Sequence, residues 1–196
     1  MRRAFTRDER DTLLAHADAL AADTDRIART RRKLQTAADL FAFLAGTGVR
    51  IGEARHLQWQ HLNLAAGTVD IHGTKSRAAR RRLNLPAWLT ARLHARGDRF
   101  GTAGLVFPSP YTAESDQPWD QSNCANTLAQ ILADCGMDWA TPHTFRRTVA
   151  TFLDTAGIPL ARIADQLRHA DPAMGVAPGS WTLETGILMV LVDQES

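Results

Sequence analysis

The chain has 196 residues, of which 44% are hydrophobic and 22% are charged, the balance of a globular protein with enough apolar material for one core. Its net charge of +2 is uneven, because residues 170–196 hold four acids and no Lys or Arg, whereas residues 50–82 hold seven basic residues and two acids. The longest apolar run, residues 187–192, is far shorter than a membrane span and the first residues lack an apolar signal segment, so composition predicts a cytoplasmic protein rather than a secreted or membrane one.

The first part of the chain predicts three helices. Thr6 followed by Glu9 is a capping-box pattern that opens the first helix. The second covers about 27–45, is apolar on most sides towards its end, and is therefore expected to be central and buried, with Gly46 as its stop. A third helix is expected over about 48–57.

The middle of the chain changes to an alternating pattern. Residues 68–73 and 82–86 alternate apolar and polar side chains, which predicts a β-hairpin with Lys75 in or beside its turn. A helix is expected over 86–96, and residues 104–108 are expected to form a short strand or extended piece.

The remaining pattern predicts three more helices. An apolar stripe with helical spacing ends at Gly136, and Thr141 followed by Pro142 marks a new helix start. Pro159 opens a last helix, expected to end at His169. The predicted fold class is α+β, mainly α-helical with a small antiparallel sheet or hairpin.

Two cysteines, Cys124 and Cys135, fall on one predicted helix. Their spacing of 11 positions corresponds to ~16 Å, too far for a disulfide. We expect reduced thiols, and no Cys/His cluster has the spacing of a zinc site.

Four short strings lie on these elements in order: residues 46–53 (GTGVRIGE), 73–76 (GTKS), 143–151 (HTFRRTVAT) and 167–171 (LRHAD). In a helical projection of the third, an aliphatic stripe lies on one side and the basic residues lie away from it. The stripe is Val149, Phe152 and Leu153, and the basic residues are His143, Arg146 and Arg147. This helix is therefore expected to present a histidine and an arginine one turn apart.

Together the four strings resemble the catalytic domain of tyrosine recombinases, the phage integrase family, over about residues 5–174. The resemblance implies that fold and a phosphoryl transfer to DNA without metal or cofactor, in which a tyrosine forms a 3′-phosphotyrosine. It implies that Arg50 and Arg146 clamp the phosphate, that His143 and His169 bond the phosphate or handle the nucleophile's proton, and that Lys75 protonates the leaving 5′-oxygen.

The remaining site candidates are supporting residues. By the same resemblance Glu53, three residues after Arg50, orients the site rather than reacting. Candidates for contacts to DNA phosphates are Arg77, Arg80, Arg81, Arg82 and Arg147. On charge alone, an ordinary solvated basic face explains these arginines equally well.

The nucleophilic tyrosine of the family does not occur where the resemblance predicts it. No Tyr follows His169, and the single Tyr of the chain is Tyr111, in a predicted loop. Ser180 and Thr182 are hydroxyls, but an alkyl hydroxyl is harder to activate than a phenol with a pKa of about 10. The acidic tail would also repel DNA.

These observations divide the chain into a catalytic-domain-like part, 1–174, and a divergent tail, 175–196, without the separate core-binding domain of most relatives. The first hypothesis is a recombinase catalytic domain, bound to double-stranded DNA near the nucleoid, that does not cleave alone. The alternatives are a non-catalytic DNA-binding or regulatory module and an inactive mobile-element remnant. Partners left open are further copies of the chain or an active recombinase on the same DNA, and no membrane partner is expected.

Overall fold

The computed structural model describes residues 3–72, 80–112 and 116–167. In these ranges the chain is mainly helical and has one antiparallel sheet of three strands in the order β1-β2-β3. The α+β prediction is therefore confirmed. The predictions for Lys75, Arg77 and His169 lie outside the described residues.

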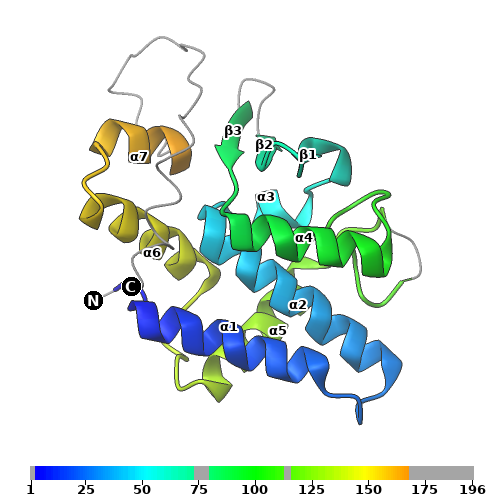
Figure 1. Ribbon diagram of the computed structural model, residues 1–196. Helices are drawn as coiled ribbons and strands as arrows, with labels where there is room; N and C mark the ends of the chain where they lie inside the picture. Colours follow the sequence, from blue (N-terminus) through cyan, green and yellow to red (C-terminus); the bar gives the residue numbers. More distant parts are fainter. Residues whose placement is uncertain (1–2, 73–79, 113–115, 168–196) are drawn as a thin grey trace.

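The long helix α2 (Ala28–Thr47) is the centre of the fold. Its second half is buried on every side, with Leu40, Phe41, Phe43 and Leu44 fully enclosed, as the sequence predicted. The helices packed around it in Figure 1 are α1 (Arg7–Ala22), α4 (Ala87–Phe100), α5 (Gln121–Asp134) and α6 (Pro142–Thr155). The predicted capping box of α1 is present, since Thr6 and Glu9 each accept the other's backbone N–H.

The end of α2 lies later than predicted. The helix continues through Gly46, and the stop is Gly48, whose φ of 66° is left-handed and whose N–H donates to the Leu44 carbonyl at 2.9 Å. Gly46 serves a different purpose, because an added Cβ would lie 2.7 Å from Leu89 Cδ2. It allows α4 to approach α2 closely.

The helix after Gly48 is shorter than predicted. It is α3 (Ile51–Arg55), and Arg50 precedes it in an extended conformation (φ −70°, ψ 144°) instead of lying in its first turn. The left-handed turn at Gly48 redirects the chain, so two residues are used before a helix begins again.

The predicted hairpin is confirmed with shifted ends. Strand β2 (Thr68–His72) pairs with β3 (Arg80–Asn84), and Ile71 lies opposite Arg81. The two-residue strand β1 (Leu62–Asn63) and the short 3₁₀ helix η1 (Trp59–His61) before it were not predicted, since neither is long enough to show a period. The piece 104–108 joins no sheet and makes two isolated bridges, from Leu105 to Gln58 and from Pro108 to Pro118.

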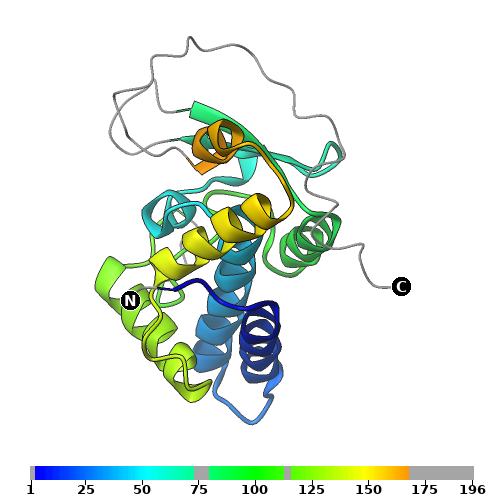
Figure 2. The same cartoon turned by 90° about the vertical axis from the view of Figure 1, so that its left-hand side faces the viewer.

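The last described helix, α7 (Leu160–Leu167), stands apart from the main core. It packs on α6 through a small separate cluster of Val149, Leu153, Ile163 and Leu167. Figures 1 and 2 both show α7 beside α6, and Arg81 near the start of β3 bonds Gln166 of α7. No helix within the described ranges is long and apolar enough to cross a membrane.

Candidate functional site

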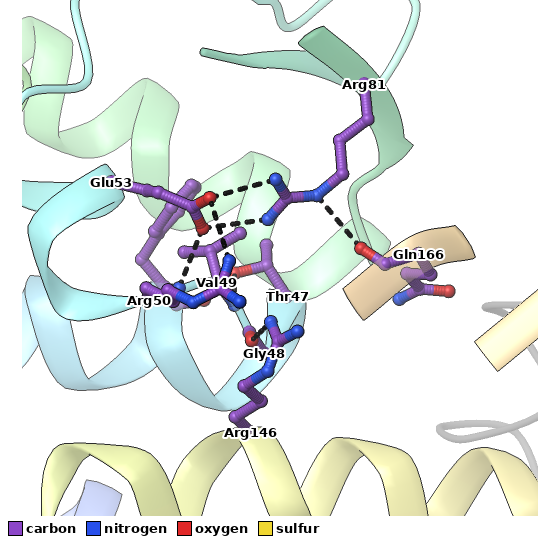
Figure 3. Close-up of polar contacts among 9 residues, drawn as sticks. Thr47, Gly48, Val49, Arg50, Glu53, Arg81, Arg146 and Gln166 are labelled. Atoms are coloured by element: carbon purple, nitrogen blue, oxygen red, sulfur yellow. Dashed lines mark hydrogen bonds and ion pairs between the residues drawn. The ribbon is translucent and has the colours of Figure 1, made fainter. Parts of the chain in front are cut away.

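Three arginines and one glutamate from different elements converge beside the Gly48 turn. Arg50 precedes α3, Glu53 lies in α3, Arg81 comes from β3 and Arg146 from α6 (Figure 3). The structure therefore brings together Arg50, Glu53 and Arg146, which the sequence analysis chose from two separate strings. We call these four residues the arginine cluster.

Glu53 is the anchor of the arginine cluster. It is 7% exposed, and its two oxygens accept hydrogen bonds from Arg81 Nη1 at 3.0 Å and Nη2 at 2.8 Å. It also accepts the Arg50 backbone N–H at 2.9 Å, while Arg50 Nη1 lies 3.6 Å from Oε1. Burial alone would raise the pKa of Glu53, but the hydrogen bonds from Arg81 and the Arg50 backbone outweigh it, so the pKa is lowered. Glu53 is therefore ionised at neutral pH.

Arg146 is buried and only partly bonded. Its residue is 3% exposed, and Nη1 donates to the Gly48 carbonyl at 3.2 Å. Its Nη2 is buried and has no hydrogen-bond partner among the described residues. Burial, followed by the positive charges of Arg50 and Arg81, lowers the pKa of Arg146 to about 10, so it remains protonated at neutral pH. An unpaired buried donor costs roughly 1–3 kcal/mol, which an anion would offset.

The burial of Arg146 corrects the helical projection. That projection placed it away from the aliphatic stripe, which is true, but the Gly48 turn covers this part of α6. Phe152, predicted in the stripe, is instead half-buried and lies under the guanidinium groups of Arg7 and Arg10.

The other described candidates lie around the arginine cluster rather than in it. His143 is exposed in the first turn of α6, one turn before Arg146. Arg147 turns towards the N-terminal segment, where its Nε donates to the Arg3 carbonyl at 3.4 Å. Arg80 is exposed, and Arg82 forms a bidentate pair with Asp70 at 2.8 and 2.9 Å on the sheet surface.

Arg81 differs from its two neighbours because strand residues alternate between faces. It shares the inward face with Leu83, which is buried, whereas Arg80 and Arg82 point outward. From the sequence all three are candidate phosphate contacts, and the pairing of Arg81 with Glu53 was not predicted. The alternation in residues 80–85 was the signal that could have separated them.

Tyr111 is distant from the arginine cluster. The residue is 40% exposed, and the centre of its ring lies 4.9 Å from the guanidinium carbon of Arg29. Arg29 is at the start of α2 and Gly48 follows its end, a separation of roughly 28 Å along the helix. Tyr111 therefore belongs to the opposite end of the central helix.

The described thiols do not supply a nucleophile either. Both cysteines are free, as predicted, and burial raises the pKa of Cys124 to about 12 and also raises that of Cys135. Thiols in this state are not ionised at neutral pH. Within the part of the chain that the structure describes, no group of three or more His, Cys, Asp or Glu side chains is placed to hold a metal ion.

Known proteins share this sequence pattern and this fold. The model of the phage integrase family matches residues 3–176, and no curated protein matches the sequence. Among solved structures, the XerA recombinase superposes with a TM-score of 0.70 at 20% identity, covering 87% of this chain and 57% of that one.

Two DNA complexes are similar in the same way. The Tn1549 transposon integrase in complex with transposon right end DNA gives a TM-score of 0.67 at 15% identity, covering 87% of this chain and 59% of that one. The XerH site-specific recombinase bound to its difH substrate gives a TM-score of 0.66 at 20% identity, covering 86% of this chain and 47% of that one. This chain thus spans about half the length of these proteins. The chain belongs to the phage integrase family, and its fold is that of a tyrosine recombinase catalytic domain.

Proposed function

We propose that this chain binds double-stranded DNA as the catalytic domain of a tyrosine-type site-specific recombinase, with Arg50 and Arg146 holding the phosphate at the point of strand exchange. The observation that carries the proposal is the buried Nη2 of Arg146, unpaired among the described residues and next to two further guanidinium groups. A phosphate oxygen is the strongest partner for such a donor. The XerH and Tn1549 integrase complexes support duplex DNA as its source.

The proposed role of the two arginines in phosphoryl transfer depends on hydrogen-bond donors that are already in position before DNA binds. Negative charge grows on the equatorial phosphate oxygens during phosphoryl transfer, and preorganised donors stabilise that charge. Arg146 Nη1 is held by the Gly48 carbonyl, and the Arg50 guanidinium forms an ion pair with Glu53 at 3.6 Å, so little reorganisation is needed. By family resemblance, Lys75 protonates the leaving 5′-oxygen and His143 and His169 assist, with no cofactor.

The remaining basic candidates fit a supporting role on the DNA backbone. These are Arg77, Arg80, Arg82 and Arg147, whose contacts would set affinity and position rather than sequence preference. A protein held on DNA in this way would be found with the nucleoid, alone or as several copies on one site.

The strand-cutting step needs a tyrosine from elsewhere. Residues 170–196 contain none, and Tyr111 lies at the other end of α2 from the arginine cluster. We therefore propose that residues 1–174 form the DNA-binding catalytic part, that the tail 175–196 supplies no nucleophile, and that this polypeptide alone does not cleave. A tyrosine donated by another recombinase on the same DNA would complete the site. Without such a donor, the chain would act as a DNA-binding regulatory module.

The first experiment measures binding of a fluorescent duplex by anisotropy over a range of salt concentrations. Replacing Arg50 or Arg146 by Ala should weaken binding about tenfold or more and reduce the salt slope by about one phosphate contact. Arg26→Ala is the control, since Arg26 pairs with Asp23 in the loop at the far end of α2. Equal affinity of all four proteins would contradict the proposal.

The second experiment tests cleavage with nicked suicide duplexes that trap a covalent intermediate. We expect no protein–DNA adduct from this chain alone. A covalent adduct that disappears in Tyr111→Phe would overturn the proposed dependence on another tyrosine. An adduct in mixtures with a tyrosine-bearing relative, but not with that relative carrying Tyr→Phe, would support it.

A further inference from the structure

A second buried donor lies in the same region as Arg146. Among the described residues, four buried side-chain nitrogens have no hydrogen-bond partner: Nη2 of Arg146, Nε2 of Gln166, Nε2 of His16 and Nε1 of Trp119. The last two belong to α1 and to the main core, whereas the first two belong to residues around Gly48. Buried polar groups are normally paired, so two unpaired donors in one region point to a ligand.

Three contacts connect Gln166 with Arg146. Gln166 lies in the last turn of α7, and its backbone carbonyl accepts Arg81 Nε at 2.9 Å. The next residue, Leu167, packs on Gly48, because a Cβ at Gly48 would lie 2.8 Å from Leu167 Cδ2. The Gly48 carbonyl accepts Arg146 Nη1 at 3.2 Å. In Figure 3 the side-chain amide of Gln166 and the guanidinium of Arg146 lie on the same side of Arg81.

The chemistry of the two atoms decides what kind of ligand they fit. Nε2 of Gln166 and Nη2 of Arg146 are both donors and carry no acceptor, so neither can be the partner of the other. Both need an oxygen acceptor, and the described residues supply none to either atom. A phosphate group has several acceptor oxygens on one centre, so it can accept from an amide and a guanidinium at once.

We propose that Gln166 is a further phosphate-binding residue, whose side-chain amide donates to the same DNA phosphate that Arg146 binds. This rests on the proposed function of Arg146. It gives α7 a part in DNA binding, although this helix packs through a cluster separate from the main core. Because the amide is neutral, Gln166 adds a directed hydrogen bond without adding charge.

The first test measures duplex binding by anisotropy over a range of salt concentrations. Gln166→Leu removes the donor and should weaken binding about tenfold, the value of one hydrogen bond to a charged group. The salt slope should not change, since a neutral side chain releases no counterion, whereas Arg146→Ala should reduce it. Gln166→Glu should weaken binding further, because a carboxylate competes with the phosphate for Arg146.

Gln35→Leu is the matched control. Gln35 is also a half-buried glutamine on a helix, but its Nε2 already donates to the Ala21 carbonyl at 3.5 Å. Its replacement should leave duplex affinity unchanged. A loss of affinity equal to that of Gln166→Leu would show that any half-buried glutamine has this effect, and would overturn the proposal.

The second test detects the contact itself by NMR of the ¹⁵N-labelled chain, with inorganic phosphate as the probe. The side-chain amide signals of Gln166 are assigned by triple-resonance spectra of the unmodified chain. They should shift saturably as phosphate is added and stay in place when chloride is added at equal ionic strength. In Arg146→Ala the response to phosphate should be lost.

Thermal melting separates a binding role from a structural one. Removing an unpaired buried amide should leave the Tm of Gln166→Leu unchanged or raised, whereas a residue that only supports the fold would lower it. Unchanged duplex affinity in folded Gln166→Leu would overturn the proposal, and so would amide signals that do not respond to phosphate. If Gln166→Leu does not fold, the NMR titration of the unmodified chain still decides.

The same measurements distinguish this proposal from the proposed function. If Arg146→Ala weakens duplex binding and Gln166→Leu does not, the proposed function stands and the role of Gln166 fails. If neither variant changes duplex binding, both proposals fail together.

Discussion

Two partly buried groups of arginines and carboxylates lie along α2 and differ in how their charges are paired. The first, which we call the α4 network, joins α1, α2 and α4. In it Arg96 donates to Asp39 at 2.6 Å and to the Val106 carbonyl at 2.7 Å, and Arg92 donates to Asp39 at 2.8 Å and to Asp18 at 2.9 Å. Two guanidinium groups thus meet two carboxylates.

The arginine cluster at the end of α2 brings three guanidinium groups together with one carboxylate, Glu53, among the residues that the structure describes. It also holds a buried donor, Nη2 of Arg146, without a partner among the described residues. A buried arginine is therefore no sign of function in itself. Within the described part of the chain, the two groups differ because the guanidinium groups of the α4 network are paired with carboxylates, whereas Nη2 of Arg146 has no partner.

The largest expected effect is the loss of stability when the α4 network is broken. Asp39→Ala leaves the buried Arg96 and the half-buried Arg92 without their shared carboxylate and should cost about 3–5 kcal/mol, or about 10 °C or more in Tm. The measurement is urea and thermal unfolding. Asp18→Ala is the control and should cost about 1 kcal/mol or less, because Asp18 is half exposed. Equal losses would show that Asp39 is not the centre of this network.

The opposite behaviour is expected at the arginine cluster. Arg146→Met removes an unpaired buried charge and should leave stability unchanged or raised by about 1 kcal/mol, while duplex affinity falls about 10–100-fold. Arg96→Met in the α4 network should instead destabilise the chain, since it leaves Asp39 short of a partner. If Arg146→Met were as destabilising as Arg96→Met, the contrast between the two groups would be lost.

A smaller effect is expected from the backbone that holds Arg146. Gly48→Ala would place a residue with a side chain in the left-handed conformation. Its Cβ would lie 2.8 Å from Leu167 Cδ2 and 3.0 Å from Val149 Cβ. The expected cost is about 2 kcal/mol, with weaker DNA binding because the Gly48 carbonyl shifts. Gly52→Ala is the matched control: nothing lies within 4 Å of its Cβ, so stability should stay constant or rise slightly.

The smallest effect is the acid response of Glu53. Burial opposes ionisation, but Arg81 and Arg50 hold the pKa below its ordinary value of 4.5. A carboxylate of this kind contributes stability that is complete above pH 4.5 and is lost as the pH falls through the folded-state pKa. Urea unfolding compared between about pH 5.5 and about pH 3 should therefore show a flatter pH dependence for Glu53→Gln. Parallel curves would contradict the pairing with Arg81.

Much of the fold was predictable because its signals are local. The capping box at Thr6 and Glu9, the buried second half of α2 and the alternating hairpin strands all depend on residues a few positions apart. The choice between Gly46 and Gly48 as the helix stop was not predictable, since it depends on Leu89, which packs against Gly46 from a distant helix.

The residues of the site were likewise predictable where the signal was local, and their long-range contacts were not. Arg50 and Arg146 were found from their strings, and the structure places both in the arginine cluster. The partnership of Glu53 with Arg81 links residues 28 positions apart, and the bond from Arg81 to Gln166 spans 85. Contacts of that range are set by the packing of the hairpin on α3 and α7, which no short pattern encodes.

The separate cluster beneath α7 has a consequence for how the molecule opens. Among the described residues, four buried aliphatic side chains, Val149, Leu153, Ile163 and Leu167, form this cluster with Ala150 and Ile158 partly buried against them, whereas α2 lies in the main core. A unit so lightly attached opens by local fluctuation at a free energy well below that of global unfolding. In native-state hydrogen exchange, the amides of α7 should exchange far earlier than those of α2. The contact between Gln166 of α7 and Arg81 of the arginine cluster would therefore break and re-form while the rest of the domain stays folded.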